Sequence, residues 1–125
     1  MLFWAQIITA LLAWLVGLYL GPQLGLYLSI WWWDIPAHFL GGLWAGFLGA
    51  WFFFNWKRRL SVLECALFAF GVGILWEIFE YTNGVGGSVG PFMGYWADTI
   101  KDLVFDVIGG VTAGTIAKYE RPWLK

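Results

Sequence analysis

Four long stretches of apolar residues divide the chain. They cover residues 2–20, 36–54, 62–81 and 97–117. Each stretch has close to the about 20 residues that a helix needs to cross the hydrocarbon core of a bilayer. Gly21 and Pro22 predict the end of the first helix, and Asp34 stands where it could cap the second. The pattern predicts an all-α, polytopic membrane protein, with one domain over residues 1–125 and four transmembrane helices.

Two of the segments that connect these helices are expected to be an interfacial segment in one case and a loop in the other. Residues 23–33 predict a short interfacial segment, and the glycine-rich residues 82–96 predict a loop. No Lys or Arg precedes the first apolar stretch, and no clear small-residue cleavage site follows it. The first stretch is therefore predicted to be a retained membrane helix and not a signal peptide.

The composition agrees with lipid as the surrounding solvent. The chain is 61% hydrophobic and only 12% charged, whereas soluble domains carry about 25% charged residues. The single cysteine, Cys65, excludes an internal disulfide and a cysteine-based metal cage. No basic stretch points to nucleic acid, so membrane lipid is the expected partner, and the pattern leaves an oligomer open.

The basic residues predict an orientation. Six of the seven lie in two clusters, Lys57, Arg58 and Arg59 after the second helix and Lys118, Arg121 and Lys125 after the fourth. Cytoplasmic loops carry the excess of Lys and Arg, so both clusters and both termini are expected on the cytoplasmic side. The exception is Lys101, which lies inside the fourth helix.

Six of the eight carboxylates fall near the opposite, outer ends of the last three helices. They are Asp34, Glu77, Glu80, Asp98, Asp102 and Asp106, and the only histidine, His38, lies one helical turn from Asp34. Residues four apart share a helix face, which places these groups on inward stripes. Small residues such as Gly42, Gly46, Gly110 and Gly114 continue the stripes. We therefore expect three helices packed tightly in the inner half around a polar cavity in the outer half, with the uncharged first helix as a lipid-facing buttress.

Carboxylates inside a membrane require a compensating group, since an Asp at the bilayer centre costs about 2.5–3.5 kcal/mol. Bound cations, shared protons, Lys101 or water could compensate. Oxygen-rich ligands with one imidazole suit Mg²⁺, Mn²⁺ or Ca²⁺ better than zinc, and the paired Glu-x-x-His motifs of a di-iron bundle are absent from the sequence. The predicted ligands of a divalent cation are Asp34, His38, Glu77, Glu80, Asp98, Asp102 and Asp106. His38 and Glu77 are the expected catalytic acid or base.

The same residues carry a resemblance to a known family. Asp-Ile-Pro-Ala-His-Phe at 34–39, Trp-Glu-Ile-Phe-Glu at 76–80, Asp-Thr-Ile-Lys-Asp at 98–102 and Asp-Val-Ile-Gly at 106–109 resemble the YjdF-like bacterial inner-membrane proteins. They are more distantly similar to the VanZ-like family, whose namesake is linked to teicoplanin resistance. The VanZ-like pattern has Gln near Glu80 and Asn near Asp106, so the resemblance does not extend to glycopeptide resistance. It implies a location in the bacterial cytoplasmic (inner) membrane.

Three functions agree with this pattern. The first is a metal-assisted membrane enzyme in which a divalent cation activates water and binds the phosphate of a lipid-linked substrate at the outer leaflet. The second is an ion or proton pathway with His38 as a relay. The inner halves of the stripes lack ionisable groups, which counts against such a pathway within one chain. The third is a non-catalytic subunit whose polar face binds a partner helix or cofactor.

Overall fold

The computed structural model describes residues 1–84 and 94–120, and within them the chain forms helices and no strand. The all-α prediction is thus confirmed for the described part of the chain. Most of the predicted loop over residues 82–96, together with Arg121 and Lys125, lies outside the described residues.

The first apolar stretch forms a helical rod of three consecutive segments. These are α1 (Leu2–Ala13), a π-helical segment η1 (Trp14–Leu20) and α2 (Gly21–Gln23). The prediction that Gly21 and Pro22 end the helix is wrong, because the wider π-helix accommodates the proline. In a π-helix residue i+5 donates to residue i, so Pro22 stands where the donor to the Gly17 carbonyl would be. The Tyr27 hydroxyl donates to that carbonyl instead, at 2.7 Å.

The predicted interfacial segment contains a one-turn helix, α3 (Leu26–Ser29), and folds back on the first rod. The Tyr27 ring packs so closely on Gly21 that a Cβ there would overlap it. Trp33 Nε1 also donates to the Val16 carbonyl, at 3.2 Å. Two aromatic side chains therefore satisfy carbonyls of η1 and hold the segment against it.

Three long helices follow, α4 (Asp34–Asn55), α5 (Val62–Asn83) and α6 (Tyr95–Ala117). Ser61 and Glu64 form a capping box that begins α5, and Gly84, with φ of 65°, ends it. Asp34 does not cap α4, which corrects the prediction. Asp34 and Asp98 both lie in the first turns of their helices, and neither helix has a side-chain cap. Their carboxylates instead contact other side chains, described below.

Three helical rods are long and apolar enough to cross a membrane: Leu2–Gln23, Asp34–Asn55 and Val62–Asn83. The 23 residues of α6 match them in length. Lys101, Asp102 and Asp106 lie so near its middle that no long apolar window avoids them. Length and composition therefore mark three membrane helices within the described residues.

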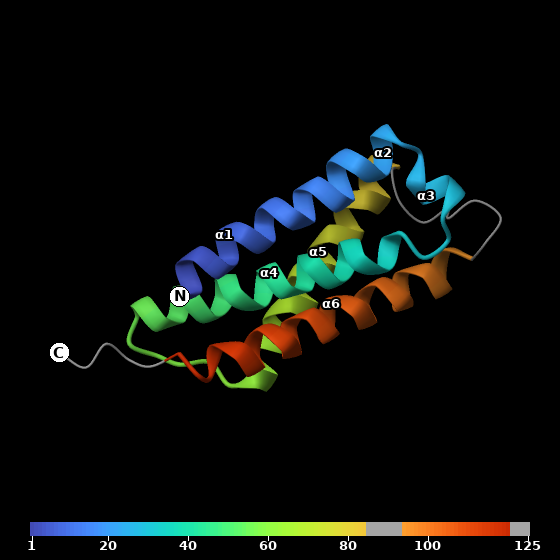
Figure 1. The fold of residues 1–125 in the computed structure, drawn as a ribbon. Coiled ribbons are helices and arrows are strands. Elements are labelled where there is room, and N and C mark those ends of the chain that lie inside the picture. Colours follow the sequence, from blue (N-terminus) through green and yellow to red (C-terminus); the bar gives the residue numbers. More distant parts are fainter. Residues whose placement is uncertain (85–93, 121–125) are drawn as a thin grey trace.

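The helices form an elongated bundle in which α4 is central. It packs against α1, α5 and α6, whereas α1 packs chiefly against α4 (Figure 1). Glycines bring α4 and α6 into backbone contact: a Cβ on Gly42 would overlap the backbone of Asp106, and one on Gly109 would overlap Phe39 and Leu43. Gly110 and Gly114 similarly face α5 at Ala69, Cys65 and Val62. The predicted close approach of the last three helices through small residues is confirmed.

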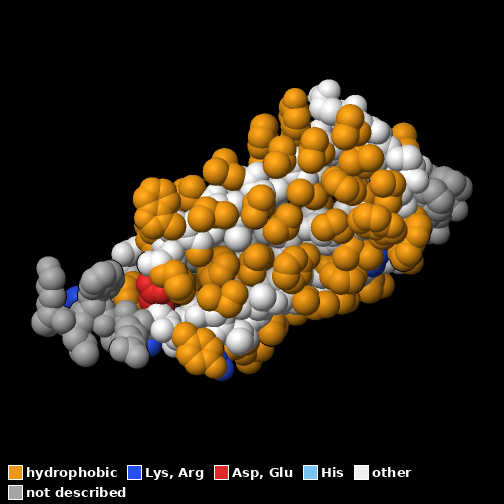
Figure 2. All heavy atoms as spheres, in the orientation of Figure 1, with side chains coloured by type: hydrophobic (Ala, Val, Ile, Leu, Met, Phe, Trp, Pro, Cys, Tyr) orange, Lys and Arg blue, Asp and Glu red, His pale blue; other side chains and the backbone are white. Residues whose placement is uncertain are grey.

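Charged groups separate between the two ends of the bundle. The described chain begins and ends at one end, where the Met1 amine pairs with Glu120 at 2.9 Å and Arg59 donates to the Glu120 carbonyl at 2.6 Å (Figure 1). Hydrophobic side chains cover most of the face shown in Figure 2. Six carboxylates lie towards the opposite end, where α5 ends and α4 and α6 begin, which we call the acidic end.

Candidate functional site

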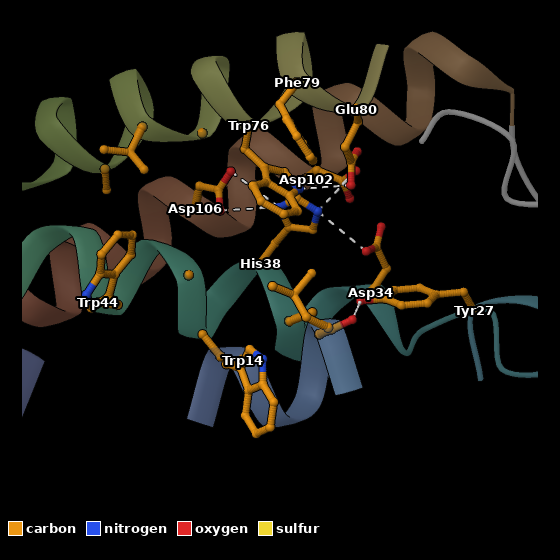
Figure 3. Close-up of a pocket in the computed structure, with 18 of the residues that line it drawn as sticks. Trp14, Tyr27, Asp34, His38, Trp44, Trp76, Phe79, Glu80, Asp102 and Asp106 are labelled. Atoms are coloured by element: carbon orange, nitrogen blue, oxygen red, sulfur yellow. Dashed lines mark hydrogen bonds and ion pairs between the residues drawn. The ribbon is translucent and has the colours of Figure 1, made fainter. Parts of the chain in front are cut away.

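A cavity of about 800 Å³ opens among the helices towards the acidic end. Every long helix contributes to its wall, and its polar lining consists of Tyr27, Asp34, His38, Glu80, Asp98, Asp102 and Asp106. In Figure 3 the His38 ring extends from α4 between Asp106 on one side and Asp34 and Asp102 on the other. The sequence stripes therefore bring most of the predicted polar groups to one cavity.

His38 is the centre of this arrangement. Its side chain is only 8% exposed, and its Nε2 atom lies 3.4 Å from both Asp34 Oδ1 and Asp102 Oδ2. Its Nδ1 atom lies 3.3 Å from Asp106 Oδ1. A neutral imidazole carries one proton, so it can donate to only one of these two sides. The other side requires either a second proton or a bound cation.

Lys101 lies beside the same aspartates and neutralises part of their charge. Its Nζ atom is 2.7 Å from Asp98 Oδ1, 3.2 Å from Asp34 Oδ2 and 3.4 Å from Asp102 Oδ1. Asp34 and Asp102 therefore each direct one oxygen to Lys101 and the other to His38 Nε2. Both carboxylates are held from two sides, which fixes the positions of the oxygens next to the imidazole.

Asp34, His38 and Asp102 form the one group among the described residues that meets the geometry for a shared metal ion. One ligand atom from each lies within 4.8 Å of the others. Asp106 then stands behind the imidazole, where it can accept the Nδ1–H bond. Metal-binding histidines commonly donate their second N–H to a carboxylate in this way, which orients the ring and leaves Nε2 free to bind.

Asp102 also has an oxygen without a hydrogen bond. The residue is 2% exposed, and within the described part of the chain its Oδ1 accepts no hydrogen bond, although Lys101 lies at ion-pair distance. Buried polar atoms without a partner are rare in folded proteins and often mark an ion or water site. This oxygen belongs to one of the three candidate ligands. The second buried oxygen without a partner in the described part of the chain is Glu77 Oε1, which lies outside the ligand group.

The two glutamates of α5 are placed differently. Glu80 lines the cavity and accepts a hydrogen bond of 2.8 Å from Trp76 Nε1. Glu77, predicted as a ligand and catalytic group, is not part of the cavity lining and accepts a bond of 3.2 Å from Thr99. Neither glutamate belongs to the three-residue ligand group.

The first helix contributes to the cavity, in addition to the exposed apolar face that its predicted role as a lipid-facing buttress requires. Trp14, Gly17 and Leu18 of η1 line the wall opposite α5. Tyr27 adds its ring from α3. Burial raises the pKa of Tyr27, and the nearby carboxylates of Asp34, Glu80 and Asp102 raise it further, so its hydroxyl stays protonated as a donor. Tyr27 was not identified from the sequence, because no local pattern marks it and its partner Gly17 is ten residues away.

The close packing of α4 and α6 explains why short aspartates reach His38. Their backbones touch at Gly42 and Gly109, so the side chains of Asp102 and Asp106 need to extend over only a few ångströms. Gly73 of α5 provides the space for the Asp106 carboxylate, which a Cβ would overlap. The small residues thus create the site as well as the helix interfaces.

Comparison with known proteins places the chain among membrane proteins. A sequence model described as "Predicted membrane protein (DUF2238)" matches residues 3–121. Neither the curated proteins nor the solved structures contain a match to the chain. The family description names a membrane protein and no reaction.

Proposed function

Because the chain belongs to the DUF2238 family of predicted membrane proteins, we propose a function that is carried out inside the bilayer. We assign the chain to the YjdF-like proteins of the bacterial cytoplasmic membrane, because the motifs around His38, Glu77 and Asp102 resemble theirs. All four helical rods cross the membrane in this proposal. The ion pairs of Lys101 with Asp34, Asp98 and Asp102 support it, because paired charges cost less in a membrane than isolated ones.

The proposed function is binding of a divalent cation for hydrolysis of a phosphate ester. The observation that carries it is the convergence of Asp34, His38 Nε2 and Asp102 within 4.8 Å, with Asp106 behind the imidazole. Two carboxylates and one imidazole suit Mn²⁺ or Mg²⁺, and Ca²⁺ is a further candidate. Asp102 Oδ1 accepts no hydrogen bond from the described residues and faces Lys101 at 3.4 Å, while Oδ2 faces His38, so the carboxylate has an oxygen in reserve for a cation next to His38.

A bound cation would supply two functions that these residues lack. It would make a bound water nucleophilic at neutral pH, and it would hold a phosphate oxygen near a cluster that otherwise repels anions. The water oxygen would bond to phosphorus and lose a proton to a general base, the ester P–O bond would break, and the leaving alkoxide would take that proton from the same group. We assign the acid–base role to Glu80, which lines the cavity, in place of Glu77. His38 serves as a ligand in this proposal.

A proton pathway has less support. Beyond Asp106, the described contacts between α4, α5 and α6 involve Gly46, Ala69, Gly110 and Ala113. These four residues carry no titratable side chain. The ionisable side chain next to them among the described residues is the buried Cys65 thiol, which is a poor proton carrier at neutral pH because a free thiol has a pKa of about 8.5.

Thermal unfolding of detergent-purified protein with Mn²⁺, Mg²⁺ or chelator tests the proposal. At a hundredfold excess over Kd, a bound cation should stabilise the fold by about 2.7 kcal/mol. The Asp102→Asn variant should lose most of this gain. Glu77→Gln, which also removes a carboxylate but lies outside the ligand group, should keep it. A melting temperature that does not change when chelator is added would contradict the proposal. So would an equal stabilisation of the two variants by the cation.

A further inference from the structure

The cavity has an apolar part that a metal and a phosphate group do not use. Beyond His38 it continues between the first helical rod and α5, over Ala37 and Gly41 of α4. Trp14 and Leu18 form one wall, and Trp76 and Phe79 form the other. Figure 3 shows Trp14 and Trp76 on opposite sides of the α4 ribbon, with Trp44 farther from the acidic end.

This apolar part is open to the side of the bundle. Trp14, Leu18 and Phe79 are 51%, 53% and 49% exposed, although all three line the cavity. The first rod packs chiefly on α4 and so leaves α5 uncovered along this side. We call this opening, bounded by Trp14, Leu18, Trp76 and Phe79 with Gly41 as its floor, the lateral cleft. In a bilayer it would face lipid.

The length and polarity of the lateral cleft suit one class of molecule. From Asp34 to Trp44 the cavity follows α4 over ten residues, about 15 Å at 1.5 Å per residue. One end carries the carboxylates and the candidate cation ligands, and the other carries aromatic and small apolar residues. A molecule with a single hydrocarbon chain and a charged head would match both ends.

We infer that the lateral cleft holds the hydrocarbon chain of a membrane alkyl or prenyl phosphate, whose phosphate lies against the cation at Asp34, His38 and Asp102. This inference rests on the proposed function, because the cation makes the acidic end attractive to an anion. The molecule enters sideways from the bilayer, and its chain never leaves an apolar surrounding. Since lipid tails are as apolar as the cleft, selectivity comes from the head group and from shape.

Two glycines provide a matched pair of variants. A Cβ on Gly41 would meet only Asp106 Oδ1, at 3.8 Å, and Gly41 lines the cavity. Gly71 of α5 also has open space, with nothing within 4 Å, and is exposed outside the cavity. Gly41→Leu should therefore fill the lateral cleft, whereas Gly71→Leu adds the same side chain to the outer surface of the bundle.

The experiment uses photo-crosslinking of the full chain in nanodiscs with a diazirine-bearing dodecyl phosphate, and peptide mass spectrometry to locate the label. We expect Mn²⁺-dependent labelling near Trp14, Leu18 and Trp76, displaced by unlabelled dodecyl phosphate. Gly41→Leu should reduce it about tenfold, the equivalent of 1.4 kcal/mol, and Gly71→Leu should leave it unchanged. Mn²⁺-dependent melting of Gly41→Leu verifies that its cation site is intact. If it is not, Val72→Trp provides a second variant, because Val72 of α5 also lines the cavity.

Other results separate the two proposals. Labelling spread evenly over the lipid-facing helices, or equal in both glycine variants, overturns the cleft assignment while a metal-dependent melting shift would still support the cation site. Cleft labelling that is unaffected by chelator overturns the contact between phosphate and cation. Better displacement by dodecyltrimethylammonium than by dodecyl phosphate overturns the assignment of an anionic head group. Inorganic phosphate should displace the label less well than dodecyl phosphate, because it lacks the chain.

Discussion

His38 determines what the polar cluster can bind, because each of its ring nitrogens faces a carboxylate. The sequence indicated the contact with Asp34, which lies four residues away on the same helix face. It could not indicate that Asp106 would face Nδ1, since the two residues are 68 positions apart. That second contact is what leaves Nε2 as the candidate metal ligand.

The aspartates were predicted as a set, and their individual roles depend on contacts between helices. The spacing of Asp98, Asp102 and Asp106 places them on one face of α6. Whether each contacts Lys101, His38 or both follows from how α4 packs against that face. Asp34 could not be recognised as an ion-pair partner for the same reason, because Lys101 is 67 positions away.

Under the proposed function, Lys101 would compete with the metal ion for the aspartates, which leads to a prediction at the residue scale. In Lys101→Met the metal-free protein should lose about 3 kcal/mol, since the buried carboxylates of Asp98 and Asp102 and the partly buried carboxylate of Asp34 lose their partner. Mn²⁺ should then stabilise the variant more than it stabilises the wild type. Melting with Mn²⁺ or chelator measures both effects.

Lys118→Met is the control, because Lys118 follows α6 at the opposite end of the bundle and is exposed. It should change neither the metal-free melting temperature nor the Mn²⁺ response. A weaker Mn²⁺ response in Lys101→Met than in the wild type would show that Lys101 holds the ligands in place and does not compete with the metal.

The elements α4 and α6 approach closely because their facing residues are glycines. The sequence showed this as small residues four apart, and the structure places Gly42 against the Asp106 backbone. The same pattern could not reveal η1 or the fold of α3. Both depend on bonds from Tyr27 and Trp33 to carbonyls ten and seventeen residues away, and no periodicity records such contacts.

Gly42→Ala tests the element scale. The new methyl group would overlap the backbone of Asp106, which cannot rotate away as a side chain can. We expect a loss of about 1–3 kcal/mol, typical of overpacking, and a weaker Mn²⁺ response because α6 shifts relative to His38. Thermal melting with and without Mn²⁺ measures the two changes.

Gly71→Ala makes the same chemical change on α5, where the added Cβ meets nothing within 4 Å. It should leave stability unchanged or raise it by up to about 1 kcal/mol, because Ala favours helix over Gly. Equal stabilities of the two alanine variants would mean that α4 and α6 are farther apart than the structure indicates.

For the whole molecule, the number of helices that cross the bilayer depends on α6. The sequence predicted four, and length and composition mark three of them within the described residues. The difference is α6, whose charged residues pair with α4 across the bundle. A hydropathy pattern counts these charges as if they faced lipid, whereas the structure places Asp98, Asp102 and Asp106 inside, each at most 4% exposed. We therefore expect α6 to cross as well.

Single-cysteine labelling of intact cells decides both the number of crossings and their direction. In a Cys65→Ala background, Asn83→Cys and Ser61→Cys place an exposed thiol at either end of α5, and Lys118→Cys places one after α6. Because Arg58, Arg59 and Lys118 favour the cytoplasm, a membrane-impermeant maleimide should label Asn83→Cys from outside. It should label Ser61→Cys and Lys118→Cys only after the cells are opened.

The Cys65→Ala protein without a new cysteine is the negative control. External labelling of Ser61→Cys with protection of Asn83→Cys would reverse the orientation. External labelling of Lys118→Cys together with Asn83→Cys would mean that α6 does not cross. The carboxylates would then lie near the membrane surface, where water could compensate them without a metal ion.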